Sequence, residues 1–153
     1  MLDVEAATRL RRAVSRIARR LNASATSEGL TPTQASVLGL IAGRGPTGLA
    51  RLAELEGLNP TMLSRVVGAL TDAGLIARNP DPSDLRVQLV TATPAGVAAH
   101  ERIKSARAQI VSASAARLTT DQLAALLQAL PALEGLADEL STQQHATGAP
   151  GKR

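Results

Sequence analysis

Apolar residues recur at helical spacing near the start of the chain. The members of this stripe are Leu10, Val14, Ile17 and Leu21. Their intervals of four, three and four residues place them on one side of an α-helix, so we predict a first helix over residues 4–25. Five arginines lie largely off the stripe: Arg9, Arg12, Arg16, Arg19 and Arg20. They form either a solvated charged face or a surface that contacts phosphate or another anion.

Three pairs of a capping residue and a proline mark further helix starts. Thr31-Pro32, Asn59-Pro60 and Thr93-Pro94 each place a polar side chain at the N-cap and a proline at the first helical position. Glycines that follow apolar runs mark helix ends. The helices predicted from these signals cover residues 32–43, 49–56, 60–73 and 94–117.

Two of these helices are joined by a short turn that contains Gly57, which is the arrangement of a helix-turn-helix. In the second helix, the predicted buried side consists of Leu63, Val66, Val67 and Leu70, and the opposite side of Thr61, Ser64, Arg65 and Gly68. A short polar outer side suits a helix whose N-terminal half enters the major groove of DNA. An ordinary amphipathic surface helix would show the same pattern, so this helix alone leaves both interpretations open.

The segment after this helix predicts a β-hairpin. Residues 75–78 and 86–91 favour strands, and the loop between them contains Pro80 and Pro82, which cannot donate to a strand ladder. A hairpin directly after a recognition helix is a wing. Arg78 is expected at its base and Arg86 at its tip.

A last helix is predicted over residues 119–140, with Pro131 kinking it near Leu127. Its apolar face consists of Leu123, Leu126, Leu127, Leu130, Leu133, Leu136 and Leu140. The first and last helices flank a small central unit that has its own core, so one subunit cannot easily bury both stripes. We therefore expect a homodimer formed by residues 1–29 and 94–140, a winged helix-turn-helix at residues 30–93, and a disordered tail at residues 141–153.

The amino-acid composition excludes several kinds of functional site and favours one class of partner. The chain has no cysteine, two histidines and no clustered carboxylates, so we predict no catalytic residues, no metal site, no cofactor and no thiol-based redox sensing. The net charge of +4 favours an anionic partner, and the complete lack of Phe, Tyr and Trp favours duplex DNA over single strands or RNA. An acidic N-terminus and the absence of a long apolar run predict neither a signal peptide nor a membrane span, and hence a cytoplasmic protein.

Three segments in order resemble the MarR family, and the likeness runs from about residue 5 to residue 140. Residues 30–35 (LTPTQA) look like the family's second-helix opening. Residues 59–67 (NPTMLSRVV), with Leu70 and residues 74–76, are similar to its recognition helix and to the segment that follows this helix. The most specific segment is residues 81–86 (DPSDLR), followed by Leu89, Thr91 and Gly96, which resembles its wing.

The resemblance implies a homodimer whose recognition helices enter successive major grooves while the wings reach the flanking minor grooves. The residues implied to bind DNA are Asn59, Pro60, Thr61, Met62, Ser64, Arg65, Arg78, Asp84 and Arg86. Arg86 would insert into the minor groove, and Asp84 would hold it in position by a charge-assisted hydrogen bond. Leu85 stands where many relatives have a basic residue, so the wing is expected to hold phosphates more weakly. Gly68 stands where a larger polar residue is common, so one base or backbone contact is expected to be missing.

The resemblance also implies an effector, a small aromatic or phenolic anion bound between the DNA-binding lobe and the dimer helices. Arg16 is the candidate for its anion contact. The function expected from all these features is a ligand-responsive repressor that binds a pseudo-palindromic operator. A helical protein–protein interaction dimer and a nonspecific architectural DNA binder on the same fold remain the alternatives, and an enzyme is not expected.

Overall fold

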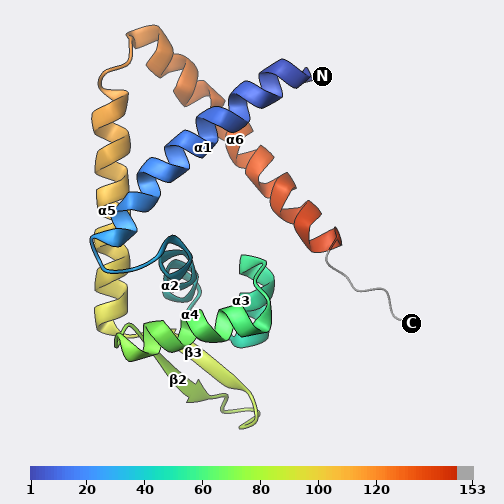
Figure 1. Cartoon of the computed structure of the whole chain (residues 1–153), viewed down its shortest axis with the longest axis vertical. Coiled ribbons are helices and arrows are strands. Elements are labelled where there is room, and N and C mark those ends of the chain that lie inside the picture. The colour runs from blue at the N-terminus through green and yellow to red at the C-terminus, as the bar shows by residue number, and fades with distance from the viewer. Residues whose placement is uncertain (148–153) are drawn as a thin grey trace.

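The computed structural model describes residues 1–147 and is mainly helical with one small sheet, as predicted (Figure 1). In chain order the elements are α1 (Val4–Thr26), α2 (Pro32–Arg44), β1 (Thr47–Gly48), α3 (Leu49–Glu56), α4 (Pro60–Asp72), β2 (Ile76–Pro80), β3 (Gln88–Ala92), α5 (Pro94–Ala115) and α6 (Thr120–Thr147). Helices α2, α3 and α4 gather over the sheet in a compact lobe, and α1, α5 and α6 extend from it (Figure 1).

The core lies in the compact lobe and is entirely aliphatic. Its largest fully buried side chains are Leu38, Ile41, Leu52, Leu70, Val37, Val67 and Val90. They come from α2, α3, α4 and β3. The same cluster also contains Ala25 at the end of α1 and Ala99 and Ile103 of α5, so the first half of α5 belongs to the core, whereas no described residue of α6 does.

The three predicted helix starts are confirmed. The side chains of Thr31, Asn59 and Thr93 accept hydrogen bonds from backbone N–H groups in the first turns of α2, α4 and α5. At Thr31 the capping box is complete, since Gln34 also accepts from the Thr31 backbone N–H at 2.9 Å. The end predicted for α2 was wrong by one residue: the helix continues through Gly43 to Arg44, and Gly45 terminates it with φ +79°.

The sheet has the order β1-β3-β2, with both pairs antiparallel. The hairpin of β2 and β3 confirms the predicted wing, but each strand lies one to two residues later than predicted. Pro80 is the last residue of β2. Proline lacks a backbone N–H, and an edge strand such as β2 tolerates it because one side of that strand has no neighbouring strand to receive a hydrogen bond. Strand β1 was not predicted, since two residues carry no periodicity.

The wing joins α5 through a close backbone contact at Gly96. Thr93 donates a hydrogen bond from its backbone N–H to the Leu75 carbonyl oxygen at 3.0 Å, and its hydroxyl donates to the Gly74 carbonyl oxygen at 2.7 Å. A Cβ added at Gly96 would overlap the Leu75 carbonyl oxygen. Glycine is therefore required at this position for the first turn of α5 to pack against the exit from α4.

Helix α6 departs from the predicted boundary. It continues to Thr147, so the tail predicted at residues 141–153 does not begin at Ser141, and its last residues, 148–153, lie outside the described part of the chain. Pro131 lies inside this helix. Leu127 is 57% exposed and Leu140 55%, so the leucine face is not buried within the subunit. No helix in the described range has both the length and the apolar character needed to cross a membrane.

Candidate nucleic-acid interface

Helix α4 divides into a buried and an exposed side, as the sequence predicts. Leu63, Val66, Val67 and Leu70 are buried against α2, α3 and the sheet. Thr61, Met62, Ser64 and Arg65 are exposed. The exposed residues occupy the first two turns of the helix, where the partial positive charge of the helix N-terminus also favours an approaching phosphate.

The cap of α4 fixes the direction in which its first turn points. The Asn59 side chain accepts a hydrogen bond from the backbone N–H of Met62 at 2.8 Å, and Pro60 follows as the first helical residue. Asn59 and Pro60 are themselves exposed beside this turn. Arg65 takes part in no ion pair within residues 1–147, so its guanidinium is not committed to a partner inside the subunit.

The wing tip is held by two acidic side chains. Asp81 accepts hydrogen bonds from the backbone N–H and the hydroxyl of Ser83, at 2.8 and 2.6 Å, and these bonds lower the pKa of the Asp81 carboxyl. Asp84 accepts a hydrogen bond from the backbone N–H of Arg86 at 3.1 Å. The role of Asp81 was missed from the sequence, although an Asp two residues before a Ser is a signal for such a turn.

The predicted hydrogen bond between Arg86 and Asp84 is made by the backbone N–H of Arg86, and no bond from the guanidinium to Asp84 is found among the described contacts. The Asp84 carboxylate therefore shapes the loop while the guanidinium of Arg86 stays exposed at the tip, next to the exposed Leu85. Arg78 is exposed on β2, where it pairs with Val90 of β3, and so lies along the wing and not at its base.

These residues share one end of the molecule. Figure 1 shows α4 and the wing at the end opposite the turn between α5 and α6. The predicted residues of α4 and those of the wing are thus brought together on one lobe, and their side chains are exposed there.

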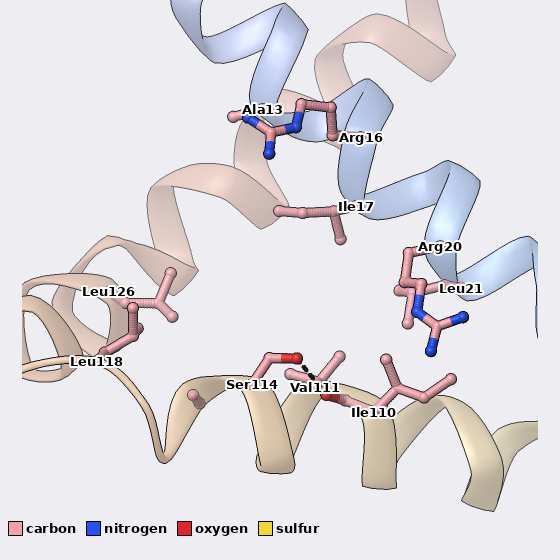
Figure 2. Close-up of a pocket in the computed structure, with 11 residues that line it drawn as sticks. Ala13, Arg16, Ile17, Arg20, Leu21, Ile110, Val111, Ser114, Leu118 and Leu126 are labelled. Carbon is pink, nitrogen blue, oxygen red and sulfur yellow. Dashed lines mark hydrogen bonds between the residues drawn. The ribbon is translucent and has the colours of Figure 1, made fainter.

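A cavity of about 460 Å³ lies between the extended helices, away from that end (Figure 2). Its wall is mainly apolar and comes from α1, α5 and the first turns of α6, with Ile17, Ile110, Val111, Leu118 and Leu126 among the lining residues. Arg16 lines it, as does Arg20, another of the five arginines that the sequence offers as a possible anion-contacting surface. None of the lining residues belongs to the DNA-binding lobe, residues 30–93. The cavity therefore lies among α1, α5 and α6, and not between these helices and the lobe, where the effector was expected.

Known proteins share both the sequence pattern and the fold. The model of the MarR family matches residues 30–87. The HTH-type transcriptional regulator MT0903.1 of Mycobacterium tuberculosis is 30% identical over 141 residues, which cover 91% of this chain and 99% of that protein. This chain belongs to the MarR family.

Solved structures support the MarR assignment. The crystal structure of RV1404 from Mycobacterium tuberculosis superposes with a TM-score of 0.76 and 26% identity, over 87% of this chain and 93% of that one. A mutant of Staphylococcus aureus MepR bound to an oligodeoxyribonucleotide has the same fold, with a TM-score of 0.66 and 15% identity, over 86% of this chain and 96% of that one.

As a MarR protein, the chain is a DNA-binding transcription regulator and not an enzyme. Regulators of this family generally need no cofactor. Across the described part of the chain, no group of three His, Cys, Asp or Glu residues is arranged to hold a metal ion.

Proposed function

We propose that this protein is a ligand-responsive repressor that binds a pseudo-palindromic operator as a homodimer in the cytoplasm. One observation carries the DNA-binding part of the proposal. The first turns of α4 and the wing tip present exposed polar and basic side chains on the same lobe, with Arg65 and Arg86 in no ion pair of residues 1–147.

The proposed contacts follow from the positions of these side chains. Ser64 and Arg65 contact base edges or phosphates in the major groove, with Thr61 and Met62 close to its floor. Asn59 and Pro60 sit where the helix N-terminus meets the phosphate backbone, and Arg78 reaches the backbone from the wing. The MepR mutant, which shares the fold, is bound to an oligodeoxyribonucleotide in its solved structure.

Arg86 is proposed to enter the minor groove beside each half-site. An arginine there favours A/T-rich sequence, because the narrow groove of such DNA has an enhanced negative potential. Asp84 supports this contact by holding the backbone of the wing tip. The exposed position of Arg86 supports this role.

Exposed surface supports the homodimer. The chain has an accessible area of 10994 Å², whereas a compact monomer of 15.8 kDa is expected to expose about 7,300 Å². The excess is of the size that permanent dimers bury, on the order of 1,000–2,500 Å² per subunit or more. Exposed apolar residues that do not line the cavity of Figure 2 also lie on the helices assigned to dimerisation: Val14, Leu127, Leu130, Leu136 and Leu140.

The effector is proposed to be a small aromatic or phenolic anion in the cavity of Figure 2. Apolar side chains cover most of the wall and suit the ring, and Arg16 supplies a positive charge for the anion. A ligand at this place lies between α1 and α5, so it can change the angle between these helices and thereby the separation of the two DNA-binding lobes.

Selection of bound sequences from a random duplex library, at a fixed and stated salt concentration, tests the proposal. We expect enrichment of a pseudo-palindrome whose half-sites lie about one helical turn apart, roughly 34–36 Å. Binding without any preferred sequence, together with a steep dependence on salt, would instead identify an architectural DNA binder. No binding by an intact dimer would favour the protein–protein interaction dimer.

A further inference from the structure

Helices α1 and α6 carry opposite charges. Helix α1 contains six arginines and one glutamate, which gives a formal charge of +5. Helix α6 contains four acidic residues and neither lysine nor arginine, which gives a formal charge of −4. The whole chain has a net charge of +4, so the residues outside these two helices carry a formal charge of +3, and α6 is the strongly acidic element of a basic protein.

None of these charges is paired with another residue of the range 1–147. The ion pairs of the described residues are Arg51–Glu54, Arg102–Glu28 and Lys104–Glu101, and none of them involves α1 or α6. The arginines of α1 and the acidic residues of α6 are all exposed. The charges of both helices are therefore available to a partner outside the subunit.

The charges are also concentrated on particular sides of the two helices. Arg9, Arg12 and Arg19, here called the basic stripe, are separated by three and seven residues and so share one side of α1. Glu134 and Asp138, here called the acidic pair, are four residues apart and share one side of α6. Like charges at these spacings destabilise an isolated helix, and an oppositely charged neighbour removes that repulsion.

The two helices do not neutralise each other inside one subunit. They do not pack along their lengths, and the C-terminal half of α6 runs away from α5 after crossing α1 in the view of Figure 1. Exposed apolar residues lie on the same helices, Val14 and Ile17 on α1 and Leu136 and Leu140 on α6. On α1 the apolar residues lie on a different side from the basic stripe, so this helix offers an apolar surface and, separately, uncompensated charge.

We propose that the basic stripe of each subunit lies against the acidic pair of a second copy of this chain. The proposal rests on the homodimer of the proposed function and specifies which helix faces meet. A second copy fits because every chain that carries the basic stripe also carries the acidic pair, and two-fold symmetry then forms the contact twice. DNA is disfavoured as the partner because α1 extends away from α4 and the wing (Figure 1).

Charge reversal with subunit mixing tests this pairing. The first variant carries Arg12→Glu and Arg19→Glu, and the second carries Glu134→Lys and Asp138→Lys. Either variant alone places like charges at both symmetric contacts, whereas a mixed dimer places opposite charges at both. Exposed ion pairs are individually weak, but several contacts change at once, so we expect each variant's dimer dissociation constant to rise at least about tenfold.

Sedimentation measures the self-association of each variant, and native mass spectrometry measures the composition of the mixture. We expect an equimolar mixture to return to the dimer at the concentration where the unmodified chain dimerises, with the mixed dimer as the main species. Circular dichroism verifies that each variant folds. A control with Arg11→Glu and Arg117→Glu makes the same change of charge outside the basic stripe and is expected to leave dimerisation unchanged.

Several outcomes would overturn the pairing. Dimerisation of both variants at the level of the unmodified chain would place the stripe and the pair outside the interface. The mixture could fail to dimerise while a single chain that carries all four reversals dimerises normally. That result would place the pairing within one subunit. Weaker DNA binding by a normally dimeric first variant would assign the stripe to DNA. If the unmodified chain is itself monomeric, the homodimer of the proposed function is wrong.

Discussion

Arg102 on α5 donates two hydrogen bonds to the carboxylate of Glu28, from Nε to Oε1 at 2.9 Å and from Nη2 to Oε2 at 2.8 Å. Glu28 lies in the connection between α1 and α2, so this pair joins two segments that are 74 residues apart. A further hydrogen bond, from Nε of Arg107 to the Ser24 hydroxyl at 3.3 Å, holds the end of α1 against α5. These hydrogen bonds link α5 to the end of α1 and to the connection that leads into α2, the first helix of the DNA-binding lobe.

The Glu28–Arg102 pair is expected to make folding sensitive to acid. The hydrogen bonds from Arg102 hold the pKa of Glu28 below its ordinary value, so the pair contributes stability above the unfolded pKa of the carboxyl and loses it as the pH falls through the folded pKa. Glu28→Gln should therefore lose less stability than the unmodified chain between about pH 6 and about pH 3. The effect is small because the pair is exposed.

Urea denaturation across this pH range, at one protein concentration, measures the difference between the two proteins. Asp81, whose pKa is also lowered, is common to both and cancels in the comparison. Parallel stability profiles would show that the pair does not couple folding to pH.

Gly96→Ala is expected to be severely destabilising. The added methyl group would overlap the Leu75 carbonyl oxygen, and a backbone atom cannot move aside as a side-chain end can. We expect a loss of more than about 2 kcal/mol in the free energy of unfolding. Gly43→Ala in α2 is the matched control, because its methyl group meets nothing within 4 Å, and it should gain up to about 1 kcal/mol. Similar denaturation midpoints for the two variants would contradict this explanation.

Gly68→Ala is expected to separate stability from DNA binding. A Cβ at Gly68 meets nothing within 4 Å, so alanine should stabilise α4 by about 0.5–1 kcal/mol. If the outer side of α4 approaches the DNA closely, the same methyl group should weaken operator binding. Thermal denaturation and fluorescence anisotropy with a labelled operator measure the two effects. Improvement of both would show that DNA does not approach the helix at Gly68.

Arg65→Ala is expected to cost about 1–3 kcal/mol of operator binding if the guanidinium contacts a base. The matched control is Arg117→Ala, since this exposed residue follows α5 at the opposite end of the molecule. Both affinities are measured by titration at one salt concentration. Equal affinities for the two variants would remove Arg65 from the DNA interface.

Arg86→Ala is expected to weaken binding most on operators with A/T-rich flanks, because the narrow minor groove of such DNA attracts the guanidinium. Operators that differ only in the flanks, compared with the unmodified protein and with Leu85→Ala, measure this preference. An equal loss on every flank would indicate a simple phosphate contact at Arg86.

The parts of the fold that the sequence predicted depend on local chemistry. Thr31, Asn59 and Thr93 cap helices through their own neighbouring residues, so their pattern is sufficient to place three helix starts. The buried and exposed sides of α4 follow in the same way from the helical period.

The parts that were missed depend on contacts between distant segments or on exposed side chains. Strand β1 exists because Thr47 and Gly48 pair with Val90 and Leu89 of β3, more than forty residues later. The orientation of an exposed arginine is not encoded locally, so the sequence predicted a hydrogen bond between Asp84 and Arg86 but did not indicate that the backbone N–H of Arg86 makes it. The cavity was misplaced because its position depends on the angles between α1, α5 and α6.

The short strand β1 has a mechanical consequence for regulation. It immediately precedes α3 and pairs with β3, the strand on which the wing returns from its tip, so the base of the wing is tied to the start of the helix-turn-helix. The recognition helix and the wing are therefore connected through the sheet as well as along the chain. If the proposed effector tilts the lobe, we expect the recognition helix and the wing to leave the DNA together and not one after the other.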